Sequence, residues 1–160
     1  MTKRDGDAVT VRRYLPNSLA PPTYVRAVGF RGNIDRWMQI QFVPGLVQVY
    51  AGSNDAGKGV DDTGMNDTLG ARIFNGVTPE TEHTTHYFWS AAHNFRVDQP
   101  QTTESFFLEV QAAFMEAQYR NIRKMTKYRT VEIRSDAGGL QARWVIAAQE
   151  QAEAAAGAGP

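Results

Sequence analysis

The sequence predicts a single α+β domain in which an antiparallel sheet packs against a long amphipathic helix. Apolar and polar residues alternate over the first two thirds of the chain, which is typical of half-buried strands. In the last third the apolar residues recur with the helical period instead. The chain has 160 residues, of which 42% are hydrophobic and 11% aromatic, so one packed core of ordinary composition is expected.

The predicted strands are separated by residues that favour turns. Pro44-Gly45 joins two of the strands into a hairpin, and Thr78–Thr81 joins the last two. The segment Leu15–Pro22 contains three prolines and is expected to be an irregular connection. The strands are expected at residues 9–15, 36–43, 46–51, 70–77 and 83–92.

The last third contains two predicted helices. Thr102–Glu104 offers a start for the first helix, which is expected to run for about twenty-five residues. Its apolar face consists of Phe106, Phe107, Val110, Ala113, Phe114 and Ala117. A glycine-containing break at 135–139 precedes a second helix at about 140–154. The expected organisation is therefore one domain over 1–155, with a disordered tail at 156–160.

Composition excludes several classes of function for this sequence. Lys plus Arg (17) balances Asp plus Glu (17), so there is no basic surface for nucleic acid or an anionic membrane. The absence of cysteine excludes disulfides, Cys-ligated zinc and a Rieske cluster, which needs two Cys thiolates and two His. No apolar run approaches the length of a membrane span, and the first residues do not form a signal peptide. A cytoplasmic location is the default expectation.

One motif points to a family. The segment Thr78–Trp89 reads TPETEHTTHYFW, and His93-Asn94-Phe95 follows shortly after it. Together with the opening Val9–Arg13 and the block Pro22–Trp37, it closely resembles the C-terminal catalytic half of Rieske-type non-haem iron oxygenases of the vanillate O-demethylase and dicamba demethylase group. The resemblance extends to Asp136–Arg143 and so covers nearly the whole chain. It implies a helix-grip (START/SRPBCC-like) fold, in which a curved antiparallel sheet wraps round a long C-terminal helix.

The same resemblance implies that the iron ligands are missing. Members of the family hold a mononuclear iron with two His and one Asp, and the two His belong to a motif that has no counterpart in this sequence. The Asp position matches Ala117, or Gln111 in an alternative register. His83 and His86 are an odd number of residues apart, so in a regular strand they point to opposite faces and cannot grip one metal together. The chain is therefore expected to hold no metal and to contain no catalytic residue.

A ligand pocket is expected to persist between the sheet and the helix. Asn75 matches a position where relatives place a polar residue that contacts substrate. Trp37, Trp89 and Phe114 are candidate wall residues. Each of these aromatic residues is also compatible with an ordinary place in the core, because aromatic side chains dominate core packing.

The resemblance implies a role as the small subunit of a two-component oxygenase. A separate large subunit would carry the 2Fe-2S cluster and the non-haem Fe(II), and an α3β3 assembly is the natural extrapolation. A ferredoxin and a reductase would supply electrons to the large subunit, and the reaction would be demethylation or hydroxylation of an aromatic compound. The alternative function is a metal-free protein that binds a small aromatic ligand. A truncated gene product, which would expose apolar surface, is the third interpretation.

Overall fold

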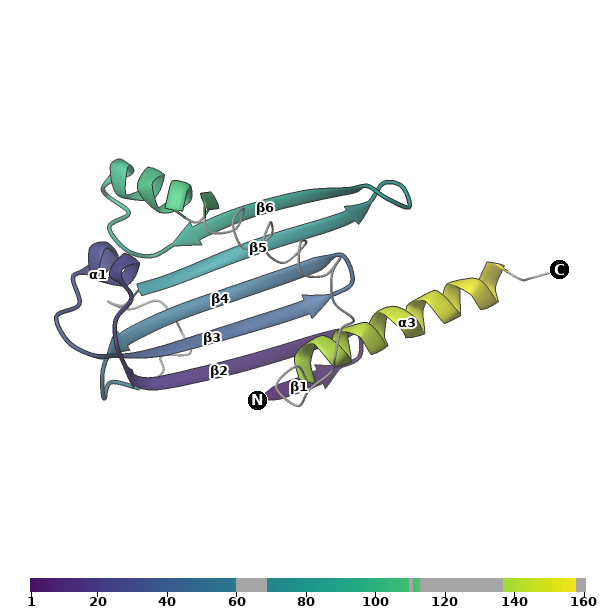
Figure 1. Cartoon of the computed structure of the whole chain (residues 1–160), viewed down its shortest axis with the longest axis horizontal. Helices are drawn as coiled ribbons and strands as arrows, with labels where there is room; N and C mark the ends of the chain where they lie inside the picture. Colours follow the sequence, from purple (N-terminus) through teal and green to yellow (C-terminus); the bar gives the residue numbers. More distant parts are fainter. Residues whose placement is uncertain (60–68, 110, 113–136, 158–160) are drawn as a thin grey trace.

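The structure is a computed structural model that describes residues 1–59, 69–109, 111–112 and 137–157. Within these residues, six strands form one antiparallel sheet in the order β1-β2-β3-β4-β5-β6 (Figure 1). Every strand therefore pairs with its neighbour in the sequence. The strands are β1 (Thr2–Asp5), β2 (Ala8–Ser18), β3 (Ile34–Val43), β4 (Leu46–Asp55), β5 (Leu69–Pro79) and β6 (Thr85–His93).

Helical segments flank this sheet. They are α1 (Pro22–Val28), residues 100–109, and α3 (Ala137–Gly157). Figure 1 shows α1 and the helix at residues 100–109 near one end of the sheet, while α3 lies beside β1 and β2 and projects past them. The predicted α+β fold is confirmed. The part of the predicted long helix beyond residue 112 lies outside the described residues. The second predicted helix is observed as α3, but it begins at Ala137, within the predicted break at 135–139, and continues to Gly157.

The expected irregular connection at Leu15–Pro22 is wrong in part. β2 continues through Pro16 to Ser18, and α1 begins at Pro22. A proline is tolerated here because β1 pairs only with the first part of β2, which leaves one side of Pro16 without a neighbouring strand. The pairing with β3 shifts between Leu15 and Ser18, and Asn17 has φ +48° at this irregularity.

Residues opposite each other in the strand register share a face of the sheet. Val11, Ile40, Val49 and Ile73 are consecutive register partners across β2 to β5. We call the face that carries them the cavity face, and the opposite one the outer face. α3 packs on the cavity face, where Gly138 lies so close to Val11 that a Cβ atom at this position would collide with its side chain.

The core lies between the cavity face and the helices. Val9 and Ile34 of the sheet and Val145 of α3 are buried, with at most 2% of each residue exposed. Burial of an aliphatic side chain of this size contributes about 1.5–3 kcal/mol to stability. Apolar residues that alternate along the strands therefore fix which face the helices cover.

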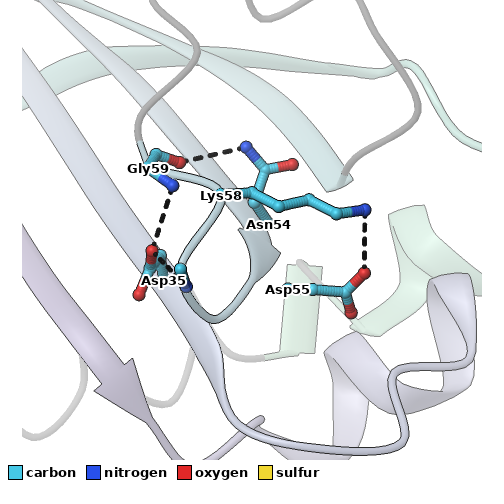
Figure 2. A network of polar contacts seen from close by, with 6 residues as sticks. Asp35, Asn54, Asp55, Lys58 and Gly59 are labelled. Carbon is cyan, nitrogen blue, oxygen red and sulfur yellow. Dashed lines mark hydrogen bonds and ion pairs between the residues drawn. The ribbon is translucent and has the colours of Figure 1, made fainter.

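A buried carboxylate joins two connections at one end of the sheet (Figure 2). Asp35 is 3% exposed and accepts backbone N–H hydrogen bonds from Asn17 (2.9 Å), Gly57 (3.0 Å) and Gly59 (3.1 Å). The hydrogen bond from Asn17 is the main cause that holds the pKa of Asp35 below its ordinary value, against the opposing effect of desolvation. Asn54 donates to the Gly59 carbonyl at 3.1 Å. The end of β4 is thus tied to the irregular end of β2.

Candidate functional site

A cavity of about 550 Å³ lies between the cavity face, α1 and the helix at residues 100–109. Its volume falls in the range of pockets that bind small molecules. The floor consists of Ala51 of β4 together with Leu69, Ala71 and Ile73 of β5. The remaining lining residues are Thr23, Tyr24, Arg26, Ala27, Phe95, Arg96, Gln101, Thr102, Ser105, Phe106 and Glu109. The arrangement can therefore hold an apolar body against the sheet and polar groups at the helices.

An aromatic cluster fixes one wall of this cavity. Phe95 is 6% exposed and meets Phe106 edge-on, with 5.5 Å between ring centroids. The His93 ring lies 4.4 Å from the Phe95 centroid and 5.0 Å from that of Phe106. His93 Nε2 also forms a hydrogen bond with Thr103 Oγ1 at 3.0 Å. These contacts hold the helix at residues 100–109 against the end of β6.

Among the described lining residues, two arginines and one glutamate carry a charge. Arg26 of α1 and Glu109 form an ion pair, with 3.0 Å between Nη2 and Oε2. Their side chains are 60% and 45% exposed, so the pair lies at the rim rather than in the interior. Arg96 follows the buried Phe95 and is exposed. The ion pair joins α1 to the helix at residues 100–109 across the cavity.

Two of the predicted pocket residues lie together on the cavity face. Asn75 follows Ile73 by two positions in β5, and Trp89 of β6 is its register partner. Asn75 is 7% exposed; its Nδ2 donates to the Val47 carbonyl at 3.2 Å, and its Oδ1 accepts from the Tyr87 hydroxyl at 2.7 Å. Neither Asn75 nor Trp89 is among the residues that line the 550 Å³ cavity. They lie further along the same face, beyond its floor.

The other two predicted pocket residues are not brought into this group. Trp37 lies on the outer face, where its ring packs over Gly52, its register partner. Phe114 lies outside the described residues, as does Ala117. The role of all four residues as pocket walls stays a prediction.

None of the described lining residues, Tyr24, Arg26 and Glu109 among them, belongs to the predicted pocket residues. Four of the missed residues belong to α1, which was not predicted because its prolines were taken as breakers. A signal was present. Pro22 lies in the first turn of α1, and Gly29 ends the helix with φ +82° and an N–H bond to the Val25 carbonyl of 2.8 Å. Proline at the start and glycine just past the end is the pattern of a short helix.

The histidines do not gather around one point in the described part of the chain. His83 precedes β6 in the turn, and His86 lies 3.5 Å from Glu80 in an exposed pair. His93 belongs to the aromatic cluster. Across residues 1–59, 69–109, 111–112 and 137–157, no three His, Cys, Asp or Glu side chains are placed to hold a metal ion. These residues therefore do not fit a mononuclear iron, and the expectation for Ala117 stays a prediction.

Comparison with known proteins identifies the family. Residues 1–152 match the family model of the vanillate O-demethylase oxygenase C-terminal domain. The chain belongs to this family. The resemblance to the C-terminal half of Rieske-type oxygenases that the Thr78–Trp89 motif indicated is thus confirmed.

Individual relatives agree with the family match. The vanillate O-demethylase oxygenase subunit of a Pseudomonas species is 34% identical over 173 residues, which cover 96% of this chain and 48% of the relative. The iron-sulfur subunit of the toluene-4-sulfonate monooxygenase system of Comamonas testosteroni is 30% identical over 146 residues, covering 86% of this chain and 42% of the relative. The chain thus spans about half the length of the curated relatives that it matches.

A solved structure shows the same fold. The crystal structure of dicamba monooxygenase matches with a TM-score of 0.67 at 17% sequence identity, over 96% of this chain and 49% of that chain. This likeness supports the helix-grip type of α+β fold predicted for the vanillate O-demethylase C-terminal family. Among the residues that the structure describes, no helix combines the length and apolar character needed to cross a membrane.

Proposed function

We propose that this chain is the small, pocket-completing subunit of a Rieske-type oxygenase that demethylates or hydroxylates an aromatic compound. The observation that carries the proposal is the family match over residues 1–152, in a chain without cysteine. A partner large subunit would carry the 2Fe-2S cluster and the non-haem Fe(II). Those groups would supply electron transfer and oxygen activation, and a ferredoxin and a reductase would deliver electrons to the partner.

In this proposal the chain's own residues bind and orient the substrate. Leu69, Ala71 and Ile73 offer an apolar floor for a planar ring. Asn75 and Trp89, further along the same face, would extend the pocket towards the partner subunit. The hydrogen bonds of Asn75 to Val47 and Tyr87 would fix its amide before substrate binds, which lowers the entropic cost of binding.

A second candidate function is a metal-free protein that binds a small aromatic ligand. The observation that favours it is the cavity itself, because described residues of this one chain form both its floor and its walls. In that case ligand binding would need no second subunit. The two functions therefore differ in whether the isolated chain binds its ligand tightly without a partner subunit.

Co-expression tests the subunit proposal. The chain, carrying an affinity tag, is expressed with and without a large oxygenase subunit that contains a Rieske domain from the same genome. We expect the two to co-purify, with iron retained by the complex and turnover of an aromatic substrate that falls when this chain is omitted. Failure to co-purify together with unchanged turnover would refute the subunit role. Tight ligand binding by the isolated chain in the same experiment would favour the second candidate.

A further inference from the structure

The two arginines that line the cavity differ in their surroundings. Arg26 is neutralised by Glu109, at 3.0 Å. The side chain of Arg96 makes no ion pair or hydrogen bond with any residue in the described part of the chain. Among the described residues that line the cavity, Arg96 is therefore a positive charge without an ion-pair partner, close to a floor of apolar side chains. A guanidinium that lacks a protein partner is available to an anionic group of a ligand.

The backbone at Arg96 is a second, independent observation. Arg96 has φ +44°, in the left-handed region that residues with a Cβ atom rarely adopt. The turn is held by a hydrogen bond from Gln99 N–H to the Arg96 carbonyl at 3.0 Å and by the buried ring of Phe95. Glycine or asparagine would adopt this conformation more readily. Strained backbone of this kind occurs preferentially at functional sites.

We infer that Arg96 is a specificity-determining residue that makes the cavity select ligands with one anionic group on an apolar, planar body. The inference rests on the proposed function, because it takes the cavity to be the ligand site. The apolar body lies on Ala71 and Ile73, and the anionic group meets the guanidinium at the rim. Glu109 disfavours a second anionic group near Arg26, because that group would compete with an existing ion pair.

A matched pair of probes tests this inference. 2-Naphthoate and 2-naphthamide have nearly the same shape and differ in charge, and their binding to the full chain is measured by ligand-observed NMR titration. We expect naphthoate to bind about tenfold more tightly than naphthamide, with a preference that shrinks as salt is raised. In Arg96→Asn the preference is expected to fall to within about twofold, while the affinity for naphthamide stays unchanged.

Two controls separate a specific role from general effects. Arg31→Asn makes the same change of net charge at an exposed residue that does not line the cavity, and it should keep the preference. Ala71→Leu fills the floor and should weaken both probes if they occupy this cavity. Because asparagine tolerates the left-handed conformation, Arg96→Asn should melt at the same or a higher temperature than the parent chain. If the role of Arg96 were only structural, the Arg96→Asn variant would instead melt at a lower temperature than the parent chain.

The outcomes distinguish this inference from the proposed function. If naphthamide binds the parent chain as tightly as naphthoate, or if Arg96→Asn keeps the preference, the role of Arg96 is refuted and the cavity remains a ligand site. If neither probe binds, or if Ala71→Leu weakens neither, the cavity is not the ligand site and both ideas fail. Loss of the preference in Arg96→Asn, with naphthamide unaffected and Arg31→Asn unchanged, supports the inference.

Discussion

The indole ring of Trp37 lies directly over Gly52, its register partner on the outer face of the sheet. A Cβ atom built on Gly52 would overlap the ring, and Trp37 is only 7% exposed. The small residue therefore creates the space in which the large one is buried. Trp37 lies three positions before Ile40 in β3, so strand alternation places the indole on the outer face rather than on the cavity face.

Gly52→Ala is expected to destabilise the protein by about 1–3 kcal/mol, because the added methyl group overpacks the Trp37 site. Urea unfolding monitored by tryptophan fluorescence provides the measurement. Gly32→Ala is the matched control, since a Cβ atom at Gly32 would meet no atom within 4 Å. An equal effect of the two substitutions on the free energy of unfolding would contradict the packing argument.

Asp35→Asn should lower stability at neutral pH, because the amide cannot replace a carboxylate that accepts three backbone N–H bonds. The folded-state pKa of Asp35 lies below its ordinary value of 3.8. Its contribution to stability is therefore fully present above the unfolded-state pKa, and it is lost as pH falls through the folded-state pKa. The parent chain should lose stability across this acid range more steeply than Asp35→Asn does.

The measurement for Asp35 is urea unfolding at a series of pH values between neutral and acid. Asp98→Asn changes the same functional group at an exposed position and should leave the pH profile of the free energy of unfolding nearly unchanged. If Asp35→Asn and the parent chain show parallel profiles, the carboxylate is not the source of the acid sensitivity.

How far the sequence anticipates the fold depends on the length of each pattern. The hairpin at Pro44-Gly45 was predicted because alternation on both sides is long, and the register confirms it, with Val43 opposite Leu46. β1 was missed because four residues are too few to show a period, although Asp5-Gly6 is a turn signal and Gly6 has φ +57°. Short elements carry little periodic information and depend on the sheet to which they pair.

The candidate site was harder to predict than the fold. Strand alternation puts Phe74 and Asn75 on opposite faces of β5 but does not say which of them faces the helices, and only the family resemblance favoured Asn75 as a pocket residue. In the structure Asn75 lies on the cavity face, while Phe74 is 42% exposed on the outer face. The Arg26–Glu109 pair joins residues 83 positions apart. Local patterns contain no information on such a contact, because it arises only when α1 and the helix at residues 100–109 meet over the sheet.

The Arg26–Glu109 ion pair is expected to contribute little to stability. Both side chains are about half exposed, so a double-mutant cycle of Arg26→Gln and Glu109→Gln should give a coupling free energy of about 0.2–1 kcal/mol, smaller at high salt. The Lys58–Asp55 pair, at 3.1 Å and with side chains 67% and 58% exposed, serves as a local comparison and should give a coupling free energy in the same range or lower. A coupling several times larger for Arg26–Glu109 would show that the pair is shielded from solvent and acts as a structural clamp.

Asn75 offers a test that separates a pocket residue from a purely structural one. Asn75→Ala leaves the Val47 carbonyl without its side-chain donor in a buried setting, so a loss of about 1–3 kcal/mol is expected in urea unfolding. Tyr87→Phe removes only the other hydrogen bond of Asn75, at a residue that is 37% exposed, and should cost about 0.5–1.5 kcal/mol.

Naphthamide affinity is then measured for both variants at a temperature where they remain folded. If Asn75 extends the pocket, Asn75→Ala weakens naphthamide binding more than Tyr87→Phe does, because the truncated side chain no longer reaches the ligand. Equal affinities, despite unequal stabilities, would assign Asn75 to the architecture of β4–β6 and leave the ligand to the cavity floor alone.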